Sequence, residues 1–345
     1  MYHKFSVLLF GVVSGMAHAE APKVVTDIAP VHSLVSRVMQ GVGEPTLIIR
    51  PEASPHGYSL RPTEAAAIQD ADLMVWMGPE LTPWLEDKLH TLMQTGENLS
   101  LLEVPDSIVL TYRQGHGFGS HEHGEDHGDE EAGHDDHEEE NHDDHAEDHG
   151  EADGEHTDHD EHDDHADETH ADHEAEGHNP HTWLDPVNAQ VWLKHIATHL
   201  AEIDPENAEM YQMNAEAGQA EMEILLSDVN KQLRPARGKP YLVFHDAYQY
   251  FESRFEVPAQ GAIALGDAST PGPARVAALH EVAQETGAAC IFSEPQFDPK
   301  IARSVFGDGV TIAVLDPIGQ GLPAGADLYP QLIRNLAQNL ADCLG

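Results

Sequence analysis

Residues 116–178 form a segment that cannot build a packed core, and this limits what the rest of the chain can fold into. The segment contains 28 acidic residues and 16 histidines, but no lysine or arginine. Because it has almost no apolar side chains, burial could not offset the conformational entropy lost on ordering. We predict a disordered insertion at these positions, so the fold must come from the chain on both sides of it.

The first nineteen residues have the layout of a cleavable secretory signal. Lys4 precedes an apolar run at residues 5–13, and residues 17–19 read Ala-His-Ala ahead of Glu20. This apolar run is well short of the ~20 residues that a membrane-spanning helix needs. We therefore expect residues 1–19 to be removed on export, and we expect no membrane insertion of the mature chain.

The two cysteines of the chain, Cys290 and Cys343, are predicted to form one disulfide after export to an oxidising compartment. The bridge would close a loop of about 53 residues. On the chain-entropy estimate, such a loop stabilises the fold by ~4 kcal/mol. Two free buried thiols are the alternative that the sequence leaves open.

The acidity of the chain excludes two classes of partner. The formal net charge at pH 7 is −45, and outside residues 116–178 the chain still has 34 acidic against 17 basic residues. An acidic body without a basic patch does not attract nucleic acid or anionic lipid. We expect the protein to bind neither.

The chain outside the insertion alternates short apolar runs with longer amphipathic stretches, which is typical of strands and helices in parallel sheets. The expected strands are 23–28, 46–51, 73–78, 107–112, 241–247, 260–265, 290–295 and 311–317. The expected helices are 30–40, 62–70, 82–94, 247–254, 273–286, 298–305 and 328–343. This rhythm predicts an α/β fold with two lobes, residues 20–203 and 238–345, each built on a mostly parallel sheet flanked by helices.

Residues 204–237 are expected to form one long helix between the lobes. Asp204 is a suitable N-cap, Pro205 fits the first helical position, and the next proline is Pro235. Apolar residues in the second half of the stretch share one helical face: Met222, Leu225, Leu226, Val229 and Leu233. About 29 helical residues span roughly 44 Å, enough for a stiff backbone between two lobes. An ordinary packed helix of one lobe fits the same residues.

Three histidines and one aspartate have surroundings that indicate a binding site. His56 follows a predicted strand in a proline-rich turn, and His245 lies at the carboxyl end of another predicted strand. Ligands of open α/β sheets bind at the carboxyl ends of strands, so both histidines lie where a site is expected. His181 lies just after the insertion, and Asp316 ends a strand of the second lobe.

Other histidines fit a metal site less well. His195 and His199 are four residues apart, as two ligands on one helix face would be. No third ligand is evident nearby, so a solvated helix face is the preferred interpretation. His32 is the next candidate.

Several motifs of the chain occur together in one protein family. They are “DIAPVHSLV”, “PEASPHGYSLRP”, “HTWLDP”, “VFHDAYQYFE”, “SEPQF” and “LDPIGQG”, with the histidine-rich insertion between the second and the third. In this combination the mature chain resembles the metal-binding receptors of bacterial ABC importers, and among them the zinc-binding type. The resemblance implies two α/β lobes joined by a long rigid helix, with the metal in the cleft between the lobes.

The resemblance also implies where the protein works and with what partners. It implies a monomer in the periplasm that delivers Zn²⁺, its transported ligand, to an ABC permease and its ATPase subunit. Periplasmic zinc chaperones would be further partners.

Carried over position by position, the resemblance implies that His56, His181 and His245 bind the zinc. Asp316 matches the family's strand-end carboxylate, and the two cysteines match a disulfide of zinc-type members. Some zinc-binding members have an acidic residue directly before the first histidine, but here that residue is Pro55. The fourth ligand is therefore expected to be water or Asp316.

The residue types favour zinc independently of the resemblance. Three neutral imidazoles and one oxygen make a tetrahedral, borderline-soft site, whereas manganese prefers more carboxylate oxygens. Affinity order alone would favour copper, so geometry and supply must contribute to selection. The expected function is a zinc receptor and not an enzyme. The alternatives are a receptor for manganese, nickel or copper, a periplasmic zinc reservoir, and a zinc hydrolase, although no H-E-x-x-H motif occurs.

The insertion is expected to be an accessory, weaker zinc collector. Its histidines recur with carboxylates between them, as in His142-Asp-Asp-His145 and His159-Asp-Glu-His162. A flexible chain must lose entropy to organise each site, so these sites should be weaker than a rigid cleft. Histidine ligands must be neutral, so binding by the insertion should weaken as the pH falls through ~6.5. A solvated acidic spacer is the alternative.

Overall fold

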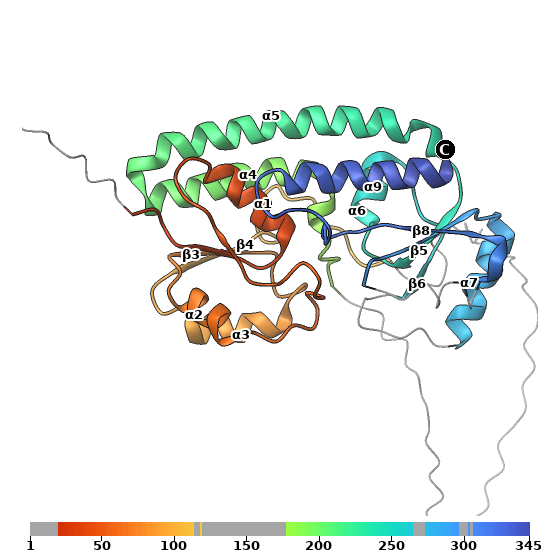
Figure 1. Cartoon of the computed structure of the whole chain (residues 1–345), viewed down its shortest axis with the longest axis horizontal. Helices are drawn as coiled ribbons and strands as arrows, with labels where there is room; N and C mark the ends of the chain where they lie inside the picture. The colour runs from red at the N-terminus through yellow and green to blue at the C-terminus, as the bar shows by residue number, and fades with distance from the viewer. Residues whose placement is uncertain (1–19, 114–117, 119–176, 265–272, 297–302, 304–305) are drawn as a thin grey trace, which may run out of the picture. The chain divides into compact units, whose positions relative to one another are not determined.

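Two parallel sheets carry the fold of the computed structural model, which describes residues 20–113, 118, 177–264, 273–296, 303 and 306–345. The first sheet contains β1 (Val24–Thr26), β2 (Thr46–Leu47), β3 (Leu73–Trp76) and β4 (Glu97–Ser100) in the order β2-β1-β3-β4. The second contains β5 (Tyr241–His245), β6 (Ala262–Ala264), β7 (Cys290–Ser293) and β8 (Thr311–Val314) in the order β6-β5-β7-β8. All strand pairs of these two sheets are parallel, which confirms the predicted fold class (Figure 1).

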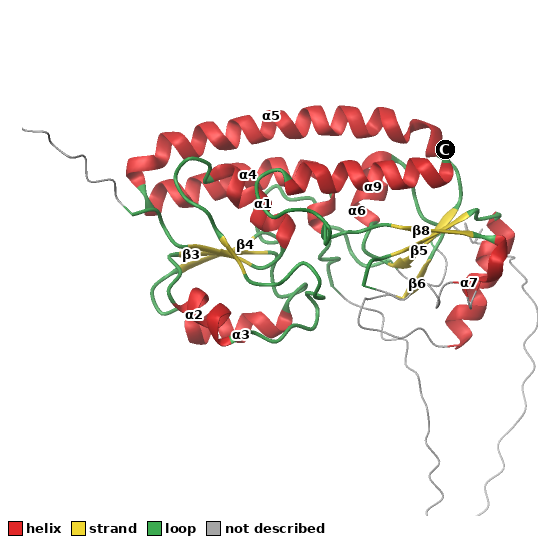
Figure 2. Cartoon of the chain, in the orientation of Figure 1, coloured by secondary structure: helices red, strands yellow, loops and turns green. Residues whose placement is uncertain are grey.

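Helices cover the sheets of both lobes. The first lobe has α1 (Ala29–Val38), α2 (Pro62–Gln69), α3 (Pro83–Leu92) and α4 (Pro186–Ile203), and the second has α6 (Gln249–Phe255), α7 (Pro273–Thr286) and α9 (Leu328–Leu344). Figure 2 shows α2 and α3 on one side of the first sheet, with α1 and α4 on the other. Strands covered on both faces read as continuous apolar runs, and the residues of β3 and β5 are all buried.

The predicted strand at 107–112 is wrong, because the fourth strand of the first sheet lies ten residues earlier. That strand, β4, pairs with β3. Its sequence, ENLS, has only one apolar residue and therefore shows no strand pattern. It becomes part of the sheet because Leu99 and Ser100 are buried there.

Segment 107–112 lies outside the sheet and is held by distant side chains and by one isolated antiparallel bridge, between Thr111 and His178. The backbone N–H of Ile108 donates to Asn188 Oδ1 at 2.7 Å, and the N–H of Leu110 donates to the hydroxyl of Tyr250 at 2.8 Å. These partners lie far away in the sequence. The alternation of apolar and polar residues in the segment predicts an extended chain, but it does not predict which groups form hydrogen bonds with its backbone.

The central helix α5 (Ala208–Leu233) has 26 residues and contacts both lobes. It packs against α4 of the first lobe and α9 of the second (Figure 1). A 3-10 turn at Pro205–Asn207 precedes it and another at Arg234–Ala236 follows it. Asp204 is the N-cap residue of the first of these turns, with Pro205 next as predicted, but its carboxylate accepts hydrogen bonds from the side chains of Asn207 and Tyr211 and none from the backbone of the turn.

The close approach of α5 to its neighbours depends on one glycine. A Cβ atom at Gly218 would lie 2.9 Å from Leu193 Cδ1 and 3.2 Å from Arg37 Cγ. Leu193 belongs to α4 and Arg37 to α1. A larger residue at this position would require the side chains of Leu193 and Arg37 to move.

The predicted disulfide is confirmed, since Cys290 at the start of β7 is bonded to Cys343 near the end of α9. None of the helices in the described part of the chain combines the length and apolarity needed to cross a membrane. Two predictions lie outside the described residues: the secretory signal and, apart from residues 118, 177 and 178, the disordered insertion. Most of the predicted helix 298–305 also lies outside them.

Candidate metal centre

Two loops and the end of one strand bring His56, His181 and His245 together. His56 lies in the turn after β2, where the indole Nε1 of Trp84 donates to the carbonyl of Pro55 at 2.7 Å. His181 precedes the 3-10 turn Thr182–Leu184 that leads into α4, and His245 is the last residue of β5.

The three histidines are close enough to share one ion. Each can offer one nitrogen, and these nitrogens lie within 4.8 Å of one another. Tetrahedral zinc with Zn–N bonds of about 2.0–2.1 Å needs nitrogens roughly 3.4 Å apart, so small side-chain movements would complete the geometry. His181 and His245 are buried, whereas His56 is half-buried. Among the described residues, this is the single group of histidine, cysteine and carboxylate side chains placed to hold a metal ion.

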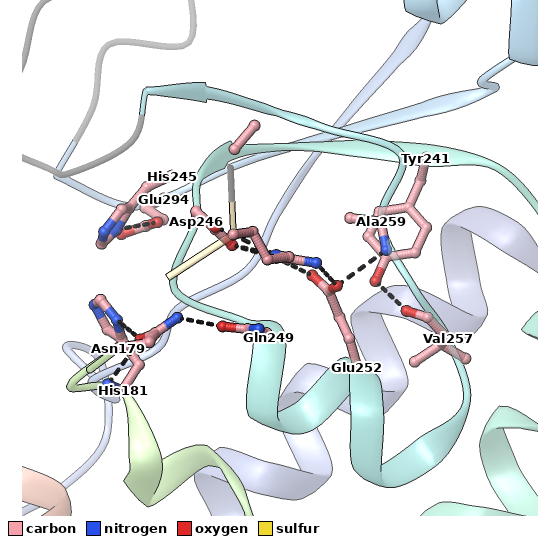
Figure 3. A network of polar contacts seen from close by, with 12 residues as sticks. Asn179, His181, Tyr241, His245, Asp246, Gln249, Glu252, Val257, Ala259 and Glu294 are labelled. Carbon is pink, nitrogen blue, oxygen red and sulfur yellow. Dashed lines mark hydrogen bonds and ion pairs between the residues drawn. The ribbon is translucent and has the colours of Figure 1, made fainter. Parts of the chain in front are cut away.

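Hydrogen bonds fix which nitrogen of each buried ring faces the centre. Nδ1 of His181 lies 2.7 Å from Asn179 Oδ1, and Nδ1 of His245 lies 3.2 Å from Glu294 Oε1 (Figure 3). When an oxygen accepts the Nδ1–H, the other nitrogen, Nε2, is left as the metal ligand. Both rings are therefore held in the tautomer that a metal requires.

Glu294 is a residue of this centre that the sequence analysis missed. It follows β7 directly, its side chain is buried, and its second oxygen accepts a hydrogen bond from Gln296 Nε2 at 2.5 Å. It lines the same small hollow as the three histidines. Its position at the carboxyl end of a strand is the signal that could have identified it, by the rule that selected His245.

Asp316 is not brought into the cluster of histidines. Its carboxylate accepts three backbone hydrogen bonds, from Ile318 at 3.1 Å, Gly319 at 2.8 Å and Gln320 at 2.6 Å. The strand-end position was predicted correctly, but the carboxylate stabilises the turn after β8. A strand-end carboxylate can serve either purpose, and the glycine at 319 lets the backbone fold back onto it with a φ of 81°.

The remaining candidate histidines lie outside the cluster of three. His32 in α1 is buried, and its Nε2 lies 3.1 Å from the carbonyl oxygen of Pro45. His195 and His199 lie on α4 and belong to no metal-binding group within the described residues. The preferred interpretation of these two as a helix face agrees with this arrangement.

The environment of His181 keeps its ring neutral. Burial lowers the pKa of His181 well below its usual value of 6.5, and the neighbouring rings of His245 and His56 add to the effect. Only a neutral imidazole can bind a metal ion, so His181 need not release a proton at neutral pH.

We expect His181 to contribute a loss of stability to the metal-free protein as the pH falls below 6.5. An unfolded histidine takes up a proton near that pH, whereas folded His181 does not, so the unfolded state binds more protons. The free energy of unfolding should fall by about 1.4 kcal/mol per pH unit through this residue, until the pH reaches its lowered pKa. Denaturant unfolding with a chelator at pH 7.5, 6.5 and 5.5 measures the slope. A His181→Gln variant should show a shallower slope, and equal slopes would contradict this assignment.

Sequence comparison places the chain in a family. The profile described as “ZnuA: Zinc-uptake complex component A periplasmic” matches residues 24–343. The chain belongs to the ZnuA family. The “High-affinity zinc uptake system protein ZnuA” of Brucella abortus is 40% identical over 340 residues, covering 98% of this chain and 96% of that protein. The ZnuA of the same name from Paracoccus denitrificans is 41% identical over 332 residues, covering 95% and 94%.

Solved structures show the same fold. A crystal structure of ZnuA matches with a TM-score of 0.69 and 19% identity, covering 94% of this chain and all (100%) of that one. The periplasmic zinc-binding protein TroA from Treponema pallidum also has a TM-score of 0.69, with 17% identity and coverage of 94% and 99%. The two-lobed architecture of this ZnuA-family chain is thus shared with these metal-binding proteins.

Proposed function

We propose that this protein captures Zn²⁺ in the periplasm with high affinity and delivers it to an ABC-type permease for import. The observation that carries the proposal is the cluster of His56, His181 and His245, whose ligand nitrogens lie within 4.8 Å of one another. Relatives about 40% identical over nearly the whole chain are named for zinc uptake. The family is one of transport receptors, and we propose no catalytic activity.

Zinc fits the donor set better than its competitors. Three imidazoles with room for one more ligand match zinc, whereas manganese prefers carboxylate oxygens. Burial of His181 and His245 and the hydrogen bonds to their Nδ1 atoms organise two ligands before the ion arrives. Less entropy is then lost on binding, which favours high affinity.

We propose water as the fourth ligand. Asp316 could reach the ion only by giving up its hydrogen bonds to three backbone N–H groups. Charge-assisted hydrogen bonds of this kind contribute about 1.5–3 kcal/mol each, so such a movement is costly. Glu294 lies behind the His245 ring, where its carboxylate accepts the Nδ1–H and so directs Nε2 to the ion.

The organisation and partners of the protein follow from the same proposal. After removal of residues 1–19, the mature chain would consist of a first lobe (20–203), a linking helix (204–237) and a second lobe (238–345). It would act as a monomer, with the permease and its ATPase subunit as partners and periplasmic zinc chaperones as possible donors. The insertion at 116–178 would collect zinc in weaker, accessory sites.

A deletion separates the receptor from a zinc reservoir. A variant without residues 120–174 keeps Phe118 and Gly177, and we expect it to retain one tight zinc site per molecule. The weaker sites of the full mature chain should disappear. Zinc stoichiometry and affinity, measured by chelator competition on both proteins, test this.

The opposite result would favour the zinc reservoir over the receptor. If the deletion removed the tight site, the insertion would be the main binder and the lobes only its support. Competition with Mn²⁺, Ni²⁺ and Cu²⁺ at the retained site identifies the cargo, and displacement of zinc by equimolar Mn²⁺ or Ni²⁺ would overturn the assignment to zinc.

A further inference from the structure

Arg113, just before the insertion, reaches from the first lobe to two carboxylates of the second. Its Nε lies 3.1 and 3.2 Å from the two carboxylate oxygens of Asp246, and its Nη1 lies 2.5 Å from Glu252 Oε2. Its Nη2 contacts both carboxylates as well. The carboxylate side chains are each only 2% exposed. One arginine therefore ties the first lobe to the turn after β5 and to α6.

Asp246 directly follows the metal-site residue His245. The N–H of Ala247 donates to the carbonyl of His245 at 2.9 Å, so the chain turns tightly here. Figure 3 shows the side chains of the two residues pointing in different directions, His245 to His181 and Asp246 away from both. The contacts that restrain Asp246 therefore also restrain the backbone at His245, and with it the direction of the His245 side chain.

Helix α6 holds the other buried histidine through the same polar network. Gln249 Oε1 accepts a hydrogen bond from Asn179 Nδ2 at 2.9 Å, and the hydroxyl of Tyr250 donates to the Asn179 carbonyl at 2.7 Å. Asn179 in turn binds Nδ1 of His181. Because Arg113 links α6 to the β5 turn, it helps to set the position of His245 relative to His181.

The groups around Arg113 keep its guanidinium charged and hold it in one position. Burial alone would lower the pKa of its guanidinium, but the Glu252 and Asp246 carboxylates outweigh this effect and raise it. The ring of Phe118 covers the guanidinium at 3.7 Å, and the N–H of Phe118 is anchored to the Gln260 carbonyl at 2.8 Å. The planar guanidinium group of an arginine can bind two carboxylates and stack on an aromatic ring at the same time, which a lysine ammonium cannot do.

We propose that Arg113 is a positioning residue of the metal centre, acting through Asp246 on His245. The inference rests on the proposed function, because it concerns affinity for the same ion. It also gives the residues at the start of the insertion a role in the centre, separate from any zinc that the insertion binds.

Arg113→Met tests the proposal in the full mature chain. Removing groups that orient a metal ligand typically weakens binding by about 10–100-fold, and we expect a loss in this range. Chelator competition with less than one equivalent of Zn²⁺ reports only the tightest site. The visible spectrum of bound Co²⁺, which reports ligand geometry, should change as well. Arg113→Lys keeps the positive charge but loses the planar guanidinium, and we expect its zinc affinity to lie between those of wild type and Arg113→Met.

Arg37→Met is the matched control. Arg37 on α1 also binds two carboxylates, Glu221 of α5 and Asp327 just before α9. Neither of these carboxylates stands next to a site histidine in the sequence. We expect the zinc affinity of Arg37→Met to stay within about threefold of wild type, and the spectrum of its bound Co²⁺ to be unchanged, whatever the change in melting temperature.

The outcomes separate this proposal from the proposed function. If His245→Ala leaves the tight site intact, the centre itself is misassigned. If His245→Ala abolishes the site but Arg113→Met keeps wild-type affinity and spectrum, Arg113 is structural only. Equal losses in the Arg113 and Arg37 variants would also overturn the positioning role. If Arg113→Met does not fold, Arg113→Lys decides, and wild-type affinity for it would count against the proposal.

Discussion

Replacing His181 by alanine should remove the tight zinc site and leave the protein folded. Zinc sites in proteins have apparent binding free energies of about 10–16 kcal/mol, so one of four ligands contributes roughly 3–4 kcal/mol. The affinity should therefore fall by about 10²–10³-fold. The fold should survive, because Asn179 Oδ1 keeps its hydrogen bond from the backbone N–H of residue 181. Chelator competition measures the affinity, and far-ultraviolet circular dichroism checks the fold.

Two matched variants test whether the effect belongs to the three-histidine centre. His195→Ala removes an imidazole from α4 outside the cluster, and we expect its zinc affinity to be unchanged. Asp316→Ala removes the acceptor of three backbone hydrogen bonds and should mainly lower the melting temperature. A loss of affinity in Asp316→Ala as large as in His181→Ala would make Asp316 a direct ligand after all.

The sequence identifies the three histidines because each has a local signal. His245 ends a strongly apolar strand, and His56 follows a strand in a proline-rich turn. His181 is the first histidine after the insertion and stands two residues before Trp183, where the chain becomes apolar again. The strand-end rule then places such residues at the edge of a sheet where ligands bind. No local pattern states that the edges of two different sheets meet. The family resemblance supplied that step, and the structure brings the side chains together.

Glu294 and Asp316 show where sequence reasoning stops. Both follow strands of the second sheet, and the strand-end rule cannot distinguish them. Their roles depend on the backbone after each strand. The chain after Asp316 folds back and offers three N–H donors, whereas the chain after β7 leaves the Glu294 carboxylate beside His245. Such turn conformations depend on contacts with distant segments.

Arg113 gives no signal in the sequence, although it makes the densest set of polar contacts near the centre. It stands next to a long polar segment, where an arginine would be expected to face solvent. Its partners, Asp246 and Glu252, lie more than 130 residues further along the chain. Two carboxylates buried without a nearby cation would be costly, so an arginine partner could have been sought once their burial was known.

Removing the disulfide should cause the largest loss of stability among these variants and leave zinc binding intact. The bond joins residues separated by 53 positions. A loop of this length stabilises the folded state by ~4 kcal/mol on the chain-entropy estimate. For a protein of this size, we expect the melting temperature of a Cys290→Ala/Cys343→Ala double variant to fall by about 6 °C. Thermal unfolding of the metal-free proteins, followed by circular dichroism, measures the change.

Zinc affinity should stay within about threefold of wild type in the same variant, because the bond and the metal centre lie at opposite ends of β7. Cys290 begins the strand and Glu294 follows its last residue, so four steps of ~3.3 Å along the strand separate them. Saturating zinc should raise the melting temperature of both proteins through the same binding equilibrium. A double variant with unchanged melting temperature would show that helix packing alone holds α9 on the sheet. A large loss of zinc affinity would instead show that the bond positions the β7 end that carries Glu294.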